Sequence, residues 1–434
     1  MFFYNFLYNC IFIPISLFLI FILKFFNSKI RERESFLVEH KDAVFIKKKH
    51  GRTIWFHSAS MGEFEQAKPI IELLKKENDD LNIIVTFFSP SGYKTQNTYK
   101  YADYITYLPF DSKRNAIEFI RKISPDLVIF IRYEIWRNFL NILNKNNIPV
   151  FLINATQPSG KFYRSFFITR SFIRSNMNFF SEIHTISEVH SEYFRRLSIN
   201  SKITTITDTR FDRIADFVRN AQENLIFPEE FISKDEKVLV AGSIWKEDEE
   251  ILIPAINQLR KTYTSKIRII FVPHEPNQNN LLRLTAKIEK FVLLSEIIKC
   301  VHDGNLMQIK EKIEGKDIVV DSIGYLLRLY NYADFAYIGG AFGNGIHSVT
   351  EAAGYGLPIA SGPDLRKSFD AVELRNLGIL NVVYSSKDLQ NWLSFYLENT
   401  DYYQKISKLS KSYIFEAIGS SQKICKSIKI KLNI

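Results

Sequence analysis

Short β-branched and aromatic runs, separated by helix-like stretches, recur along the chain and limit its fold more than any other feature. Strands spaced by helices of this length are typical of βαβ units around a parallel sheet. In the first half the runs are "TIWFHS" (53–58), "NIIVTFF" (82–88), "DYITYLP" (103–109), "DLVIFI" (126–131), "PVFLIN" (149–154) and "EIHTIS" (182–187). They predict a first α/β domain.

A second series of runs follows a charged, polar stretch at 212–235, which carries Pro228. We therefore predict two similar α/β domains with a cleft between them, one at 28–211 and one at 236–400, joined by a connector at 212–235. Residues 401–434 are predicted to form a basic helical tail. The runs of the second series are "KVLVAG" (237–242), "IRIIFVP" (267–273), "DIVVDS" (317–322), "DFAYIGG" (334–340) and "LPIAS" (357–361).

The amino terminus predicts a membrane anchor. Residues 2–23 contain no charge, and about 20 such residues in a helix span the ~30 Å hydrocarbon core of a bilayer. No basic stretch precedes this run and no small-residue cleavage site follows it, which argues against a removed signal peptide. We predict a transmembrane anchor at 1–27, short or tilted because of Asn5, Asn9 and Pro14. The basic residues that follow place the rest of the chain on the cytoplasmic side.

The charge and the cysteines limit the partners and the compartment. A formal net charge of +10 favours anionic partners, such as nucleic acid, phosphorylated metabolites or an acidic membrane surface. The three cysteines are far apart and form no C-x-x-C pair. This pattern indicates a reducing compartment and gives no support for a structural zinc site.

A basic and aromatic stretch at 161–180 has two functional interpretations. Interleaved basic residues and rings occur in nucleic-acid binders, and also in helices that lie in a membrane interface and meet anionic headgroups. The presence of an anchor favours the membrane interpretation, and a buried aromatic helix with basic edges is the structural alternative. The basic residues concerned are Lys161, Arg164, Arg170 and Arg174.

Glycine-rich turns at the strand ends of the second half predict a phosphate-binding site. Glycines let backbone amides approach a ligand, and a helix N-terminus favours an anion. The richest turn, "IGGAFGNGIHSVTEA", precedes a helix predicted to start near His347, and Glu351 in that helix is placed to accept hydrogen bonds from ribose hydroxyls. Ordinary tight turns with a solvated Glu351 are the alternative. No dinucleotide or P-loop fingerprint and no metal-binding motif occurs, so neither a metal nor another cofactor is expected.

Three ionisable residues stand at strand ends in the first half and could form an acid–base site. Glu63 follows the strand "TIWFHS" and, with Ser60, has the S-x-x-E spacing of a capping box. Glu134 and Arg210 are the other two. In the structural alternative, Glu134 pairs with Arg132 or Arg137, and Arg210 braces the connector.

Several blocks of the sequence carry a family resemblance. In order they are "WFHSASMGEFEQAKPII", "RYEIWRNFL", "INATQPSGKFYRS", "TDTRFDR", "AGSIWKEDEEIL", "VPHEPN" and "DSIGYLLRLYNYADFAYIGGAFGNGIHSVTEAAGYGLPIASGP". They resemble the Kdo transferase family, whose members are membrane-anchored enzymes of lipopolysaccharide synthesis, and the resemblance covers about residues 1–420. It implies a GT-B glycosyltransferase fold of two Rossmann-like domains and the transfer of Kdo, an acidic sugar, from CMP-Kdo to the lipid A precursor (lipid IVA) with inversion at the anomeric carbon.

The resemblance also implies roles for individual residues. Glu63 matches the general base of the family, and Glu134 and Arg210 match positions that stabilise the transition state. A helix N-terminus is expected to lower the pKa of Glu63 and so keep it ionised, while Gly62 leaves room for the acceptor sugar. The 161–180 segment would meet the acceptor or the membrane. Contacts to CMP are expected at Pro273, His274, Glu275, Ile323, Gly324, Tyr325, Ser348, Val349, Thr350 and Glu351.

The chain departs from the commoner pattern of the family at three places. "PHEP" stands where many relatives have an arginine-bearing P-R-H-P, Arg210 stands where lysine is frequent, and "GNGIHSVTEA" is a variant loop. The expected partners are CMP-Kdo, the lipid A precursor and inner-membrane lipids, with no nucleic acid, and the expected location is the cytoplasmic side of the inner membrane. Another GT-B enzyme, such as a UDP-sugar transferase or epimerase, is an alternative because a fold does not determine a function. A basic nucleic-acid-binding protein is a further one.

Overall fold

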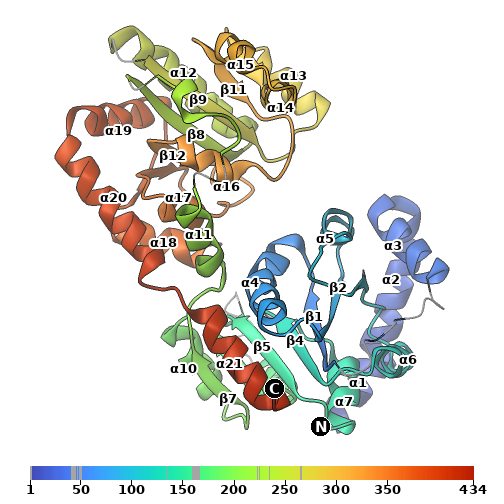
Figure 1. Ribbon diagram of the computed structural model, residues 1–434. Coiled ribbons are helices and arrows are strands. Elements are labelled where there is room, and N and C mark those ends of the chain that lie inside the picture. Colours follow the sequence, from blue (N-terminus) through green and yellow to red (C-terminus); the bar gives the residue numbers. More distant parts are fainter. Residues whose placement is uncertain are drawn as a thin grey trace. The chain divides into compact units, whose positions relative to one another are not determined.

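The computed structural model describes residues 2–40, 45, 47, 51–132, 134–158, 167–221, 223, 225–233, 235–263 and 266–434. The chain forms two compact units; in Figure 1 unit 1 runs from blue to green and also includes the red helix α21. Unit 1 comprises Met1–Asp212 and Ile418–Ile434, and unit 2 comprises Arg213–Ala417. Each unit contains a parallel sheet of seven strands. The prediction of two α/β domains is confirmed, and the cleft between them stays a prediction.

The sheet of unit 1 has the strand order β3-β2-β1-β4-β5-β6-β7. Consecutive side chains of its central strand β1 enter opposite faces: Ile54 and Phe56 belong to one apolar cluster and Trp55 to the other. Burial of both faces explains why β1 reads as a nearly continuous apolar run. The strands are β1 (Thr53–Ser58), β2 (Asn82–Phe87), β3 (Tyr104–Tyr107), β4 (Leu127–Ile131), β5 (Val150–Ala155), β6 (Glu182–Thr185) and β7 (Lys202–Thr205).

Helices cover both faces of this sheet (Figure 1). The cluster that contains Ile54 and Phe56 also takes side chains from α3, α4, α5 and α21, while the cluster around Trp55 takes side chains from α6, α7, α9 and α10. These helices are α3 (Ser28–Glu39), α4 (Met61–Glu77), α5 (Pro90–Gln96), α6 (Lys113–Ile123), α7 (Arg137–Lys145), α9 (Phe167–Met177), α10 (Glu188–Arg195) and α21 (Ser420–Leu432).

The predicted anchor is helical. A helix runs through α1 (Phe2–Leu7), a π-helical turn η1 (Tyr8–Phe12) and α2 (Ile13–Phe26). Within the described part of the chain, Phe3–Phe26 is the single helix that is long and apolar enough to cross a membrane, judged by length and composition.

The predicted tail 401–434 consists of two helices that belong to different units. Helix α20 (Thr400–Phe415) lies in unit 2, whereas α21 returns to unit 1 and packs on α4. The Asp212 carboxylate fixes the start of α21, because it accepts hydrogen bonds from the N–H groups of Gly419 (2.5 Å) and Ser421 (2.7 Å). A carboxylate at this end also complements the helix dipole.

The sheet of unit 2 has the order β10-β11-β9-β8-β12-β13-β14. Its strands are β8 (Glu236–Ile244), β9 (Lys266–Pro273), β10 (Phe291–Leu293), β11 (Asp317–Val319), β12 (Phe335–Ile338), β13 (Ile359–Ser361) and β14 (Leu380–Val382). Its helices are α11 (Arg210–Arg219), which begins in unit 1, η3 (Glu229–Phe231), α12 (Lys246–Thr262), α13 (Gln278–Thr285), α14 (Leu294–His302), α15 (Leu306–Ile313), α16 (Leu326–Leu329), η4 (Tyr330–Tyr332), α17 (Thr350–Gly354), α18 (Phe369–Asn376), α19 (Ser386–Glu398) and α20. The predicted connector 212–235 therefore contains most of α11.

Three strands are absent from the sequence prediction: β7, β10 and β14. All three lie at an edge of a sheet and have only three or four residues. An edge strand buries less of its surface than a central strand, so its sequence needs no long apolar run. Strands of three or four residues are also too short to show the apolar pattern that reveals β1 or β8.

Candidate functional site

Glu63 lies at the carboxyl end of β1, in the first turn of the 17-residue helix α4. Its Oε2 atom accepts hydrogen bonds from the backbone N–H groups of Ala59 (2.6 Å) and Ser60 (3.3 Å). The Ser60 hydroxyl in turn accepts a bond of 3.5 Å from the Glu63 N–H. The predicted capping box is present, and it holds the carboxylate in one place.

The pKa of Glu63 is raised from 4.5 to about 7. Burial, which penalises the charged form, is the largest cause, and the nearby Glu134 carboxylate adds to it. Hydrogen bonds from Ala59 and Ser60 and the charge of Arg132 lower the pKa, but by less. The expectation that the helix N-terminus lowers this pKa is therefore wrong, because desolvation has the greater effect. A carboxyl group that titrates near neutrality is well suited to act as a general base.

Glu134 follows β4, the strand that pairs with β1. Its Oε2 atom accepts a hydrogen bond of 2.6 Å from Nε1 of Trp136 and lies 3.5 Å from Nε2 of the buried His57. Arg137, one of the two arginines expected to pair with it, instead donates to Asn5 and to other side chains of unit 1. Glu134 is thus placed by the Trp136 indole, close enough to Glu63 for its charge to affect the pKa of Glu63.

Arg210 belongs to a chain of polar contacts that reaches α4. Its guanidinium donates to Oδ2 of Asp208 at 2.7 and 3.0 Å, and the same oxygen accepts a bond of 2.8 Å from Nε2 of Gln66. The side-chain oxygen of Gln66, Oε1, accepts a hydrogen bond from Nε of Arg132 at 3.1 Å. Burial alone would raise the pKa of Asp208, but Arg210 and Arg132 hold this pKa below its ordinary value. The ionised Asp208 carboxylate therefore holds the guanidinium group of Arg210, and the Gln66 side-chain amide holds that of Arg132.

The sequence analysis missed Arg132, Gln66 and Asp208 as parts of this site. Arg132 is the first residue after β4 and has a left-handed backbone with φ of 65°. Such a conformation is strained for a residue with a long side chain, and strain of this kind often marks functional sites. Its position at a strand end was a signal in the sequence, whereas Gln66 and Asp208 are 142 residues apart and no local pattern connects them.

Gly62 directly precedes Glu63 in α4 and is exposed. A Cβ atom built at Gly62 would meet no protein atom within 4 Å. The fold therefore does not need a glycine at this position for packing. Open space next to Glu63 agrees with the expectation that a substrate approaches here.

The predicted basic and aromatic segment is described from residue 167 onward, so Lys161 and Arg164 lie outside the described residues. Helix α9 buries Ile173 and Met177 in the core of unit 1. Arg170 and Arg174 lie on its exposed edge, where they donate to the backbone oxygens of residues 196 (2.6 Å) and 198 (3.1 Å). The described part thus combines a buried face with a basic edge.

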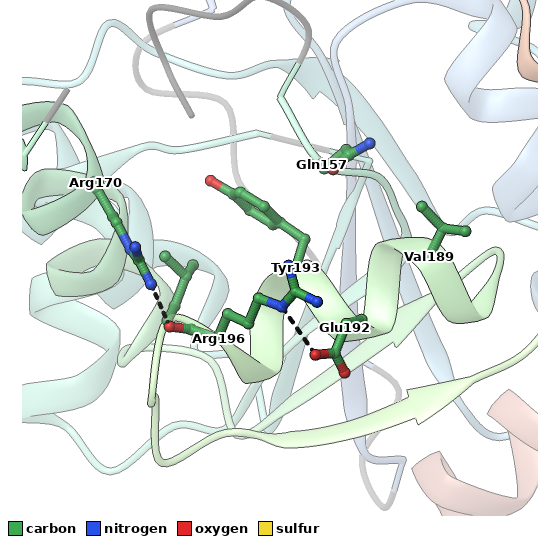
Figure 2. Close-up of a pocket in the computed structure, with 7 residues that line it drawn as sticks. Gln157, Arg170, Val189, Glu192, Tyr193 and Arg196 are labelled. Carbon is green, nitrogen blue, oxygen red and sulfur yellow. Dashed lines mark hydrogen bonds and ion pairs between the residues drawn. The ribbon is translucent and has the colours of Figure 1, made fainter. Parts of the chain in front are cut away.

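A cavity of about 520 Å³ lies between α9 and α10 (Figure 2). Figure 2 shows Arg170 and Arg196 on its wall, with Arg196 paired to Glu192 at 2.9 Å. Gln157, two residues after the end of β5, places the cavity at the carboxyl edge of the sheet. The lining residues are Gln157, Arg170, Val189, Glu192, Tyr193, Arg196 and Leu197.

In unit 2, three aromatic side chains stack at the carboxyl ends of β8, β9 and β12. The rings of Trp245 and His274 are 4.8 Å apart and those of His274 and His347 are 4.2 Å apart. Nε1 of Trp245 donates to Nε2 of His347 at 3.1 Å. Burial and the neighbouring His274 lower the pKa of His347 to about 4, so His347 is neutral at pH 7. The stack brings the predicted donor residue His274 next to the glycine-rich turn.

Asp248 in the first turn of α12 holds that turn in place. Its Oδ2 atom accepts from the N–H groups of Trp245 (2.8 Å) and Gly340 (2.9 Å), and its Oδ1 atom accepts from the hydroxyl of Tyr337 (2.8 Å). Gly340 has φ of 92°, and a Cβ there would lie 2.5 Å from the Gly345 oxygen. This position therefore requires glycine. The sequence analysis missed both Trp245 and Asp248.

The predicted donor residues after this turn lie on or next to a helix, α17, that begins at Thr350 and not near His347. Ser348 and Thr350 are 3.2 Å apart through their hydroxyl oxygens. Glu351 is half-buried. Burial lowers the pKa of Arg213, and the nearby negative charge of Glu351 opposes this fall. It is not a fully solvated helix acid.

The remaining predicted donor positions follow β9 and β11. Pro273 and Glu275 line a cavity of about 110 Å³ that Trp245 and Asn344 also line. Gly324 has φ of 94° in the turn after β11, between Ile323, which is exposed, and Tyr325, which is half-buried. No group of three or more potential metal ligands occurs among the described residues.

Comparison with known proteins agrees with the motifs. The family model described as 3-deoxy-D-manno-octulosonic-acid transferase (kdotransferase) matches residues 29–213. The chain is 26% identical over 333 residues to the 3-deoxy-D-manno-octulosonic acid transferase of Chlamydophila psittaci, which covers 74% of this chain and 72% of that protein. It is 27% identical over 374 residues to the enzyme of the same name from Rickettsia bellii, covering 85% and 84%.

Among solved structures, the UDP-GlcNAc 2-epimerase of Neisseria meningitidis bound to UDP-GlcNAc superposes with a TM-score of 0.59 and 15% identity, covering 88% of this chain and 100% of that one. At this identity the match shows the fold alone, which is the predicted GT-B fold. By its sequence motifs, by the family match over residues 29–213 and by these two relatives, this chain is similar to the Kdo transferases, which are glycosyltransferases.

Proposed function

We propose that this protein transfers Kdo from CMP-Kdo to the lipid A precursor in lipopolysaccharide biosynthesis, with inversion and release of CMP. Similarity to the Kdo transferases supports the transfer of Kdo. The mechanism rests on the Glu63 carboxyl group, which has a pKa of about 7 and is held in place by two backbone N–H groups.

In this mechanism the ionised Glu63 removes the proton from an acceptor hydroxyl as its oxygen attacks the anomeric carbon of Kdo. The bond from that carbon to the CMP phosphate oxygen breaks, and CMP leaves with the bonding electrons. One displacement at the anomeric carbon inverts its configuration. Because CMP is a good leaving group, no general acid is needed on its side.

Arg132 and Arg210 supply positive charge close to the proposed base. Kdo carries a carboxylate, and charge-assisted hydrogen bonds from arginine are well suited to hold such a group. Asp208 and Gln66 position the two guanidinium groups. Glu134 raises the pKa of Glu63 and in this way makes it a stronger base.

The donor is assigned to unit 2. The stack of Trp245, His274 and His347 presents aromatic surface, and the turn held by Asp248 presents backbone amides. In this proposal the amides of the turn bind the phosphate of CMP-Kdo, and Glu351 binds its ribose. Since "PHEP" lacks the arginine of the commoner motif, the phosphate depends more on these amides.

The proposed base can be tested by replacing Glu63 with Gln, whose side-chain oxygen can still accept the two capping bonds but cannot take a proton. With CMP-Kdo and a tetra-acylated lipid A precursor, turnover should fall by roughly 10²–10⁴, the usual contribution of a general base. Ser60→Ala is the matched control, because it removes a capping bond and leaves the carboxylate.

Product mass identifies what is transferred and how many units are added. Incubation with UDP-sugars in place of CMP-Kdo tests the alternative donor class. A normal rate for Glu63→Gln would rule out Glu63 as the general base. Transfer only from a UDP-sugar would rule out CMP-Kdo as the donor.

The apolar N-terminal helix supports a site of action at a membrane. We place the enzyme at the cytoplasmic face of the inner membrane, where the lipid A precursor is accessible to a cytoplasmic nucleotide sugar.

A further inference from the structure

The apolar N-terminal helix is fastened to unit 1 near its beginning. The hydroxyl of Tyr8 donates to Oδ2 of Asp111 at 2.7 Å. The amide groups of Asn9 and Asn138 form two reciprocal hydrogen bonds of 3.1 and 2.9 Å. One turn earlier, the Asn5 side-chain oxygen accepts from Nε of Arg137 at 2.8 Å. We call these contacts the first dock.

The unit 1 partners in the first dock are part of its folded interior. Asp111 is 1% exposed, Asn138 3% and Arg137 0%. The Asp111 carboxylate also accepts from the backbone N–H groups of Asn138 (3.2 Å) and Phe139 (3.1 Å) at the start of α7. The dock is therefore attached to a rigid element. It pairs polar side chains that would otherwise be left unsatisfied in lipid.

The chain meets unit 1 again soon after the apolar helix. Arg33 in α3 is 4% exposed, and its guanidinium donates to the Leu108 oxygen at 2.7 Å and lies 4.2 Å from the centre of the Phe88 ring. Phe36 packs on Tyr107 with ring centres 5.1 Å apart. We call these contacts the second dock.

The two docks lie close together. Leu108 of the second dock and Asp111 of the first are three residues apart, so their Cα atoms are separated by at most about 11 Å. Both docks belong to unit 1. The chain thus contacts the same part of the folded unit at Asn9 and again at Arg33.

Between the docks, α2 exposes apolar side chains on most of its surface. Only 11% of the most apolar 18-residue window of this helix is buried. Phe12, Phe18 and Phe25 are exposed by 54%, 63% and 61% of their surface. Such a concentration of exposed apolar surface requires a partner.

We propose that residues 2–40 form a membrane-contact element that enters a single leaflet and does not cross the bilayer. A crossing helix has its ends about 30 Å apart on opposite sides of the hydrocarbon core. The first dock keeps Tyr8 and Asn9 against a folded unit whose other contact, at Arg33, is on the same side. Helix α2, which is apolar on most of its surface, then enters the acyl chains of one leaflet, and the chain returns to the same side through α3. This revises the predicted transmembrane anchor at 1–27.

The partner is an anionic phospholipid leaflet, because basic residues collect where α2 ends. The ammonium group of Lys24 lies 4.5 Å from the centre of the Phe21 ring, and Arg31 donates to the backbone oxygens of Lys24 (3.0 Å) and Phe25 (3.1 Å). Lys29 is close by in sequence. A hollow of about 460 Å³ between α2 and α3 is lined by Lys24 and Arg31 and also by Glu34 and Glu39, so the basic groups that meet the leaflet are those at the end of α2 and not the hollow itself.

The side on which the N-terminus lies tests the proposal directly. The full-length protein carries one protease-cleavable tag before Met1 and a second tag after Ile434. In membrane vesicles of known orientation, both tags should be cut in the same vesicles. Cleavage of the two tags in vesicles of opposite orientation, or protection of the N-terminal tag in both, would overturn the proposal.

A second test measures the first dock itself in membranes. In a Cys10→Ser background, Asn9→Cys and Asn138→Cys are combined and treated with a short bis-maleimide. The pair should cross-link in native membranes, whereas Phe18→Cys with Asn138→Cys should not, because Phe18 lies about 14 Å further along the helix. Equal cross-linking of the two pairs, or none for the first, contradicts the dock.

The lipid partner is tested with purified protein and vesicles. Lys24→Ser with Lys29→Ser should weaken binding to phosphatidylcholine vesicles that contain phosphatidylglycerol by roughly 30-fold, since each basic group near an anionic surface contributes about 1 kcal/mol. Binding to vesicles of phosphatidylcholine alone should not change. Unchanged binding to both kinds of vesicle would show that the leaflet charge is not recognised here.

Discussion

The carboxyl groups of Glu63 and Glu134 follow two neighbouring strands, β1 and β4, and the charge of Glu134 helps to raise the pKa of Glu63 to about 7. Each acid has its own donors, the Ala59 and Ser60 amides for one and the Trp136 indole for the other. The two carboxyl groups are thus fixed near each other, so that one of them titrates near neutral pH.

This relationship predicts the pH dependence of the reaction. A general base is active when ionised, so kcat/KM should rise with pH and level off above an apparent pKa near 7. Glu134→Gln removes a neighbouring negative charge and should move this midpoint to lower pH. Initial rates from pH 5.5 to 9 give the profile, and a rate independent of pH across this range would exclude Glu63 as the base.

The same pKa predicts an effect on stability. The folded-state pKa is raised from 4.5 to about 7, so the stability that Glu63 contributes is fully present below pH 4.5 and is lost as the pH rises through 7. At pH 8.5, Glu63→Gln should be more stable than the wild type by roughly 3 kcal/mol. The difference should nearly disappear at pH 4.5.

Urea denaturation at both pH values measures this difference in the free energy of unfolding. Glu39→Gln, at an exposed position of α3, serves as the control and should show no such pH-dependent gain. Equal stability of Glu63→Gln and the wild type at pH 8.5 would mean that burial does not penalise the charged Glu63.

Gly62→Ala tests the open space beside the base. A Cβ here meets no protein atom, and alanine favours a helix more than glycine by up to about 1 kcal/mol, so the thermal midpoint should stay the same or rise. If the acceptor uses this space, its KM should increase while that of CMP-Kdo does not. A stable variant with unchanged acceptor KM places the acceptor elsewhere.

Asp248 is predicted to be needed for the donor turn. Asp248→Ala leaves three donors, the N–H groups of Trp245 and Gly340 and the hydroxyl of Tyr337, without their acceptor. Each unpaired buried group costs about 1–3 kcal/mol, so both the stability of unit 2 and CMP affinity should fall. Asp248→Asn keeps one oxygen for the two amides and should lose much less. Equal losses in both variants would show that charge, and not hydrogen bonding, matters at this position.

Glu351→Ala should weaken CMP binding by about 1–3 kcal/mol if this carboxylate binds the ribose, because two hydroxyl groups lose their acceptor. Calorimetric titration with CMP measures the loss. Glu311→Ala, at an exposed position of the same unit, is the control. Thermal unfolding of the two variants separates a loss of ligand contacts from a loss of structure around Arg213.

The sequence alone determines the class of fold and the local structure around the base. Alternating strand and helix patterns predict the central strands of both sheets, since strands buried on both faces must be apolar along their length. The S-x-x-E spacing predicts the capping box, which depends only on residues 60–63. The edge strands β7, β10 and β14 escape prediction because partial burial leaves them no distinct pattern.

Only the tertiary structure decides how the candidate site and the N-terminal helix behave. The pKa of Glu63 depends on what buries it and on Glu134, 71 positions later in the chain, and Gln66 meets Asp208 across 142 residues. The apolar run at 2–23 reads as a spanning helix by composition, yet its course depends on the polar contacts of Tyr8 and Asn9 with α7 and the segment before α6. Desolvation and long-range hydrogen bonds arise from packing, and packing brings together residues that no local pattern connects.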